Sequence, residues 1–115
     1  MIQGMPHTKI WLAAGVTDMR KGFVGLSAIV ESVLEREPYG GHLFVFRGRK
    51  GDLMKMIWWD GTGACLLSKR LELGRFVWPS AQSGVVHLRQ SQLSMLLEGI
   101  DWRIIKDTAR PLKVG

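Results

Sequence analysis

The sequence predicts an α+β fold, in which helices pack on one face of a small, mainly antiparallel sheet. Residues 42–70 contain three runs rich in aromatic and aliphatic side chains, separated by glycine-bearing turns, and this order is typical of a β-meander. Two other stretches, 19–34 and 93–97, space their apolar residues as one face of a helix does. The chain has 115 residues, which suits a single domain spanning 1–115 with one core.

The predicted meander has strands at 42–47, 53–59 and 64–70, joined by turns at 48–52 and 60–63. Side chains alternate along a strand, so a simple register predicts two faces of different character. The core face would contain Phe44, Phe46, Met54, Met56, Trp58, Cys65 and Leu67. The other face mixes aromatic, aliphatic and cationic side chains: Val45, Arg47, Lys55, Ile57, Trp59, Leu66, Ser68 and Arg70.

The part of the chain before the meander predicts a strand at 9–14 and then a helix. Thr17 or Asp18 can cap this helix, because a side-chain oxygen there can accept from the free amides of its first turn. Its apolar stripe consists of Met19, Phe23, Leu26, Ile29, Val30, Val33 and Leu34. We expect the stripe to cover the core face of the meander and to bury Phe46, Met56 and Trp58.

The part after the meander predicts an edge strand at 85–88 and a second helix. Ser91 can cap this helix and Gly99 can end it, since glycine readily adopts the left-handed conformation found at a helix C-terminus. The helix would bury Leu93, Leu96 and Leu97. The two termini, 1–8 and 102–115, are expected to be a loose lead-in and a basic tail.

The charge balance favours an anionic partner, most often a nucleic acid. Lys and Arg number 16 against 10 Asp and Glu, a formal net charge of +6. No apolar run approaches the ~20 residues that span a membrane, and the N-terminus lacks the apolar stretch of a signal peptide, so we expect a cytoplasmic protein. The lone Cys65 excludes an internal disulfide and suits a small buried side chain better than a catalytic thiol.

The sequence predicts no catalytic residue, metal ligand or cofactor. Its three histidines are far apart and have no cysteine or histidine neighbour at ligand spacing. Asp18 and Asp60 have structural explanations, as a helix cap and a turn residue, although clustered carboxylates also hold metal ions in nucleases. A metal-dependent nuclease that uses Asp18 and Asp60 therefore stays open as the weaker alternative, and whether the chain is an enzyme is undecided.

Several motifs, taken in chain order, carry a family resemblance. They are 17–22 (TDMRKG), 41–49 (GHLFVFRGR), 55–61 (KMIWWDG), 69–72 (KRLE), 74–76 (GRF), 78–79 (WP) and 96–101 (LLEGID). With these motifs the chain closely resembles the TnpB-type accessory protein, which is encoded by the second open reading frame of insertion-sequence-66 elements. The resemblance extends from about Ile10 to Asp101.

This resemblance implies a bacterial mobile-element protein that assists transposition beside a separate, larger transposase. The expected partners are the DNA of the transposon ends, the transposase and other element-encoded proteins, and further copies of the chain, with a place on the nucleoid. The leading hypothesis is a non-catalytic DNA-binding subunit. Its candidate DNA-binding residues are Arg20, Lys21, Arg47, Arg49, Lys55, Trp59, Lys69, Arg70 and Arg75. The alternative is a protein–protein interaction module that docks on the transposase without touching DNA.

Overall fold

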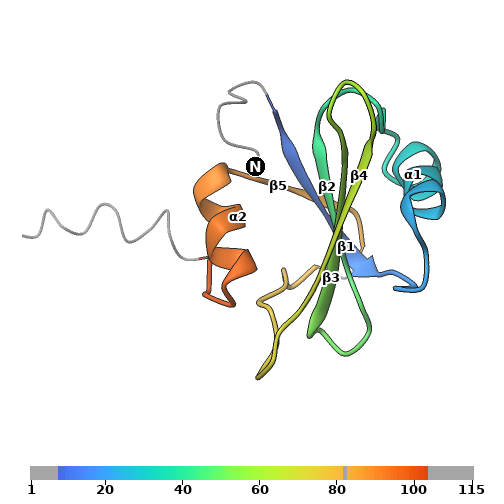
Figure 1. The fold of residues 1–115 in the computed structure, drawn as a ribbon. Helices are drawn as coiled ribbons and strands as arrows, with labels where there is room; N and C mark the ends of the chain where they lie inside the picture. The colour runs from blue at the N-terminus through green and yellow to red at the C-terminus, as the bar shows by residue number, and fades with distance from the viewer. Residues whose placement is uncertain (1–7, 82, 104–115) are drawn as a thin grey trace, which may run out of the picture.

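In the computed structural model, which describes residues 8–81 and 83–103, a five-stranded sheet lies between two helices (Figure 1). The elements follow as β1 (Ile10–Val16), α1 (Phe23–Ser32), β2 (Leu43–Arg47), β3 (Leu53–Trp59), β4 (Ala64–Arg70), β5 (Val85–Leu88) and α2 (Gln90–Leu97). The strand order across the sheet is β4-β3-β2-β1-β5. β1 and β2 are parallel and joined through α1, whereas the other pairs described are antiparallel. The α+β class and the mainly antiparallel sheet are therefore confirmed.

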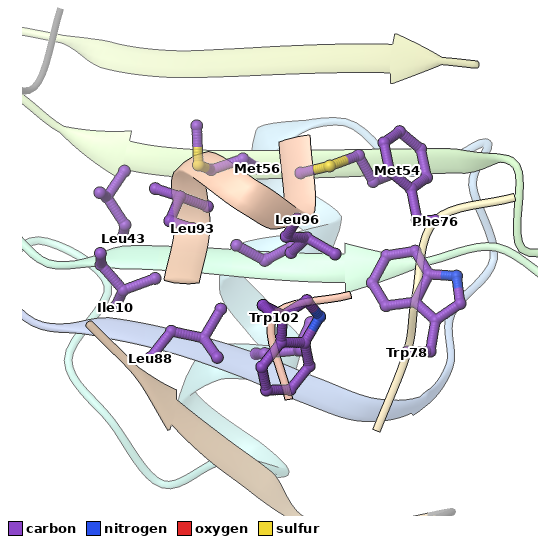
Figure 2. Packing of buried hydrophobic residues seen from close by; sticks show 12 residues of the cluster. Ile10, Leu43, Met54, Met56, Phe76, Trp78, Leu88, Leu93, Leu96 and Trp102 are labelled. Carbon is purple, nitrogen blue, oxygen red and sulfur yellow. The ribbon is translucent and has the colours of Figure 1, made fainter. Parts of the chain in front are cut away.

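β2 lies at the centre of the sheet, and its first four residues are buried on both faces. On one face, Phe44 belongs to a cluster that includes Leu26 of α1. On the other face, Leu43 belongs to a cluster that includes Leu96 of α2 (Figure 2). The helices thus cover opposite faces, and the prediction that both pack on one face is wrong. A strand buried on both faces shows a continuous apolar run, which does not reveal that a second layer is present.

The register between β2 and β3 differs by one residue from the predicted one. Phe44 lies opposite Ile57, so Phe44 and Phe46 share the α1 face with Ile57, whereas Met54 and Met56 lie on the α2 face. Between β3 and β4 the register is the predicted one. Because β2 is apolar at four successive positions, its hydrophobic pattern does not define a register.

The adjacent Trp58 and Trp59 point to opposite faces, and both are half-buried. Met56 belongs to the cluster on the α2 face, and Trp58 packs against that cluster. The expectation that Met56 and Trp58 are buried against α1 is therefore wrong. Of the three residues expected on the α1 face, only Phe46 lies there. Trp59 lies on the α1 side, where its ring meets the ring of Tyr39 edge-on at 5.3 Å between centroids.

α1 begins later than predicted, with Gly22 as its N-cap in place of Thr17 or Asp18. Oδ1 of Asp18 instead accepts a hydrogen bond from the backbone N–H of Arg20 at 2.9 Å. This local bond closes a turn, which competes with helix formation. Residues 17–22 are therefore a connection beyond the end of β1, and they contribute to the candidate site below.

α2 begins at Gln90, before the predicted cap Ser91, because Arg89 is its N-cap. The backbone N–H of Arg89 donates to the side chain of Gln92 at 2.9 Å. The predicted end of the helix at Gly99 is confirmed, since this residue has a φ of 76° and closes the last turn.

The predicted lead-in and tail fall, apart from Thr8, Trp102 and Arg103, outside the described residues. Trp102 does not belong to a tail, because it is buried in the cluster on the α2 face and its Nε1–H donates to the carbonyl of Val77 at 2.7 Å (Figure 2). Within the described ranges, no helix has the length and apolar character needed to cross a membrane.

Candidate nucleic-acid interface

The topology brings three connections together at one end of the sheet. β1 and β2 are parallel and end there, β3 begins there, and β4 ends there. The connections are 17–22 after β1, 48–52 between β2 and β3, and 71–75 after β4. Figure 1 shows this end at the bottom of the view, where the turn between β2 and β3 approaches the chain that leaves β4.

Backbone contacts hold the three connections in place. The backbone N–H of Thr17 donates to the backbone carbonyl of Arg47 at 2.9 Å, and the backbone N–H of Leu71 donates to the backbone carbonyl of Asp52 at 2.9 Å. Gly48 lies so close to Met19 that a Cβ at this position would come within 2.7 Å of the Met19 Cγ. Any larger residue at position 48 would therefore require the Met19 side chain to shift.

The gathered connections and strand ends carry eight cationic side chains, which we call the basic end: Arg20, Lys21, Arg47, Arg49, Lys50, Lys55, Arg70 and Arg75. Three carboxylates, Asp18, Asp52 and Glu72, accompany them, which leaves an excess of five positive charges. Asp18 pairs with Arg20 at 2.8 Å and Asp52 with Arg70 at 3.2 Å. Both pairs are exposed enough for water and salt to screen them, so an incoming phosphate can compete for the arginines.

An open cavity of about 340 Å³ lies between the connections 48–52 and 71–75. Arg49, Lys50 and Arg75 line it, together with Asp52 and Gly74. Lys50 was not among the predicted site residues, although its place beside Arg49 in the same turn could have indicated it. Three cations around one concave surface suit the binding of a phosphate group.

The strand cations reach the basic end from both faces of the sheet. Lys55 lies on the α1 face, where its Nζ donates to the carbonyl of Lys21 at 2.9 Å. Arg47, opposite Met54, lies on the α2 face. The expectation that Arg47 shares one face with Lys55 is therefore wrong, because it relied on the shifted register of β2. The two cations still meet at the same end of the sheet.

Two predicted site residues are not part of the basic end as defined here. Lys69 precedes Arg70 on β4, but its Nζ donates to the carbonyl of Leu97 at 2.7 Å, so this lysine satisfies the C-terminus of α2. Trp59 lies at the opposite end, where β3 finishes, against Tyr39. The remaining seven predicted residues are all part of the basic end.

The charges that the structure describes at the opposite end of the sheet are balanced. The cations there are Lys9, Arg36 and Arg89, and the anions are Glu35, Glu37 and Asp60. Arg36 lies over the ring of Trp11, with its Cζ 3.9 Å from the ring centroid. This end therefore lacks the excess charge that attracts a polyanion.

A metal site shared by Asp18 and Asp60 is contradicted by the topology, because Asp18 follows β1 at the basic end and Asp60 follows β3 at the opposite end. The hydrogen-bonded Arg20 guanidinium holds the pKa of Asp18 far below its usual range. The backbone N–H groups of Thr62 and Gly63 lower the pKa of Asp60. Across 8–81 and 83–103, no three His, Cys, Asp or Glu side chains are grouped to hold a metal ion.

Comparison with known proteins identifies relatives over the whole chain. The sequence profile described as IS66 Orf2-like protein matches residues 8–107. The chain is 53% identical over 115 residues to the uncharacterized protein y4hO of Sinorhizobium fredii, which covers 100% of both chains. It is 40% identical over 109 residues to the uncharacterized protein y4jC of the same organism, which covers 93% of both. No solved structure matches.

Proposed function

The chain belongs to the family of IS66 Orf2-like proteins, and from this premise we propose that it is a transposition accessory protein that binds DNA through its basic end. Its partners would be the transposon ends and the element-encoded transposase. It would act as a non-catalytic subunit on DNA in the bacterial cytoplasm.

The observation that carries the proposal is the excess of five positive charges at the basic end. The DNA backbone is a dense row of phosphates, and cations that neutralise them release condensed counterions. Contacts to phosphates position a protein on DNA but do not read the bases. We therefore expect affinity for DNA of any sequence, with selection of the transposon ends supplied by the transposase.

The test is a titration of purified protein with transposon-end DNA and with random DNA of equal length, at several salt concentrations. If each of the five excess charges replaces one counterion, log affinity should fall against log salt with a slope of about −4.5 on duplex DNA. The affinities for transposon-end DNA and for random DNA should differ little. A protein that shows no salt-sensitive binding, yet co-purifies with its transposase, would overturn the proposal.

A second candidate function, docking on the transposase without DNA contact, is favoured by one apolar groove. A cavity of about 360 Å³ between α1 and β1 is lined by the apolar side chains of Val16, Ile29, Val33 and Leu34, and also by Asp18 and Lys21. Val16 and Val33 are 53% and 68% exposed, which is unusual for side chains that serve only a core. Under this alternative, Val33→Glu would abolish co-purification with the transposase, and the double variant Arg49→Ala with Arg75→Ala, outside the groove, would not.

A further inference from the structure

Among the described residues, Arg47 is the one arginine that is not exposed, and no carboxylate of that part of the chain lies within ion-pair distance of it. Arg20, Arg70 and Arg103 each pair with an aspartate at 2.8–3.2 Å. Those three side chains are exposed, whereas Arg47 is half-buried. Partial burial of a cation without an anionic partner costs free energy, and binding of an anion beside it would offset this cost.

The guanidinium of Arg47 is held from one side only. Its Nε donates a long hydrogen bond of 3.4 Å to the carbonyl of Gly48, and its Cζ lies 5.3 Å from the centroid of the Trp78 ring. Trp78 is itself fixed, because it is buried and its Nε1–H donates to the carbonyl of Gly51 at 3.0 Å. Within the described chain, the two terminal amino groups of Arg47 have no hydrogen-bond acceptor. The guanidinium is thus oriented, with its paired donors free.

Arg47 also lines a further cavity, of about 340 Å³. It is lined by Arg47, Gly15 and Val16 at the ends of the parallel strands, and by Pro79, Ser80 and Ala81 of the chain that precedes β5. Of the charged residues that the structure describes, Arg47 is the one that lines it. The cavity shares no lining residue with the one that Arg49, Lys50 and Arg75 line.

We propose that this cavity binds one phosphate group of the nucleic acid, which Arg47 holds by two parallel hydrogen bonds. The inference rests on the proposed function and assigns to the basic end one fixed phosphate position beside the diffuse surface charges. A planar guanidinium matches two phosphate oxygens at once, and the ring of Trp78 lies on one side of it at 5.3 Å from Cζ to the centroid. The phosphate could be an internal phosphodiester or the terminal phosphate of a strand, because both offer the same pair of oxygens.

The test compares Arg47→Lys with Arg89→Lys, since both substitutions keep the charge and remove the planar fork, and Arg89 is exposed at the opposite end of the sheet. Arg47→Lys should weaken DNA binding about tenfold or more, and Arg89→Lys about twofold or less, because a bidentate bond is lost only in the first. Ser80→Glu is a second variant that leaves Arg47 and its contact with Trp78 in place. The new carboxylate should fill the cavity and weaken DNA binding as strongly as Arg47→Lys does. Ser80→Gln introduces a side chain of equal size without the charge and should weaken DNA binding less. Thermal unfolding of each variant checks the fold.

Binding to duplexes with and without a terminal 5′ phosphate distinguishes an internal phosphodiester from the terminal phosphate of a strand. If adding this phosphate strengthens binding by the parent but not by Arg47→Lys, the ligand is the strand end. If Arg47→Lys loses the same factor on both duplexes, the ligand is an internal phosphodiester. Either result supports the cavity as a phosphate site.

Failure of this inference is separable from failure of the proposed function. If the parent binds DNA with the expected salt dependence, but Arg47→Lys and Ser80→Glu bind as tightly, the cavity is not a phosphate site and the proposed function stands. If the parent binds no DNA, inorganic phosphate alone serves as the probe. The NMR signal of the Arg47 Nε–H should shift on phosphate addition in the parent and stay unmoved in Ser80→Glu, and an unmoved signal in the parent overturns the site.

Discussion

The two ends of the sheet are built from the same strands but differ in charge. At the basic end, the connections 17–22, 48–52 and 71–75 bring eight cations together with three carboxylates. At the opposite end, three cations balance three carboxylates, and one of those cations, Arg36, is engaged with the ring of Trp11. The same sheet thus presents one end suited to a polyanion and one end without such a preference.

The connections carry most of the candidate site, while the strands position it. The strand residues are largely occupied by packing against α1 and α2. The connections can carry dense charge because their backbone groups are satisfied by one another. The carbonyl of Gly51, for example, accepts from both the N–H of Phe76 and the indole of Trp78 at 3.0 Å.

The largest effect is expected at the aromatic support of the basic end. Trp78→Ala should lower the free energy of unfolding by about 3–5 kcal/mol, because it removes a large buried ring and its hydrogen bond to Gly51. Trp59→Ala, at the opposite end, should cost less than about half of that, since Trp59 is half-buried. Urea unfolding of the two variants measures both values. Equal losses of unfolding free energy would show that the two tryptophans stabilise the two ends of the sheet to the same extent.

A second comparison concerns charge. The double variant Arg49→Ala with Arg75→Ala should reduce the salt slope of DNA binding by about 1.8, because each lost phosphate contact removes about 0.9. The matched variant Lys9→Ala with Arg89→Ala removes the same charge at the opposite end and should leave the slope nearly unchanged. Fluorescence anisotropy across salt concentrations gives both slopes. A similar reduction in both variants would mean that net charge alone determines binding.

Two glycines in turns at opposite ends allow a test of backbone geometry. Gly51 and Gly61 have φ values of 81° and 101°, so alanine at either position should destabilise the fold by about 1–2 kcal/mol. At Gly51 the added Cβ also meets Arg75 and Trp78 at 3.4 Å, whereas at Gly61 it meets nothing within 4 Å. Gly51→Ala should therefore weaken DNA binding as well, and Gly61→Ala should not. Loss of DNA affinity in Gly61→Ala would contradict the assignment of the site to the basic end.

The smallest effect is a pH dependence at the opposite end. Burial, and then the charge of Lys9, lower the pKa of His42, whose Nδ1 accepts from the Lys9 backbone N–H at 3.0 Å. The folded state therefore takes up this proton less readily than the unfolded state does. The stabilisation is full above the ordinary histidine pKa of about 6.5 and is lost as the pH falls through the lower folded value.

Unfolding followed between neutral and mildly acidic pH should show a small loss of stability in the parent. His42→Asn should flatten this dependence, because the amide oxygen can accept the same hydrogen bond without titrating. The matched variant His87→Asn, at an exposed position, should show the same pH dependence of stability as the parent. DNA binding corrected for the folded fraction should be alike in both variants, since neither residue lies at the basic end.

The local features of this protein could be predicted from its amino-acid sequence. The strands at 53–59 and 64–70, their mutual register and the end of α2 at Gly99 all agree with the structure. These features depend on alternation along one strand, on short turns and on glycine geometry, so neighbouring residues suffice to define them. The excess of positive charge and seven of the nine predicted site residues at the basic end also came from composition and motif alone.

The faces and ends of the sheet that these residues occupy depend on long-range packing. β2 is apolar on both sides, so its register and the second layer formed by α2 depend on contacts with distant parts of the chain. The parallel pairing of β1 with β2 placed residues 17–22 beside 48–52, and a long-range hydrogen bond took Lys69 to the end of α2. Such contacts join residues far apart in sequence, and their free energy depends on burial that no local pattern records.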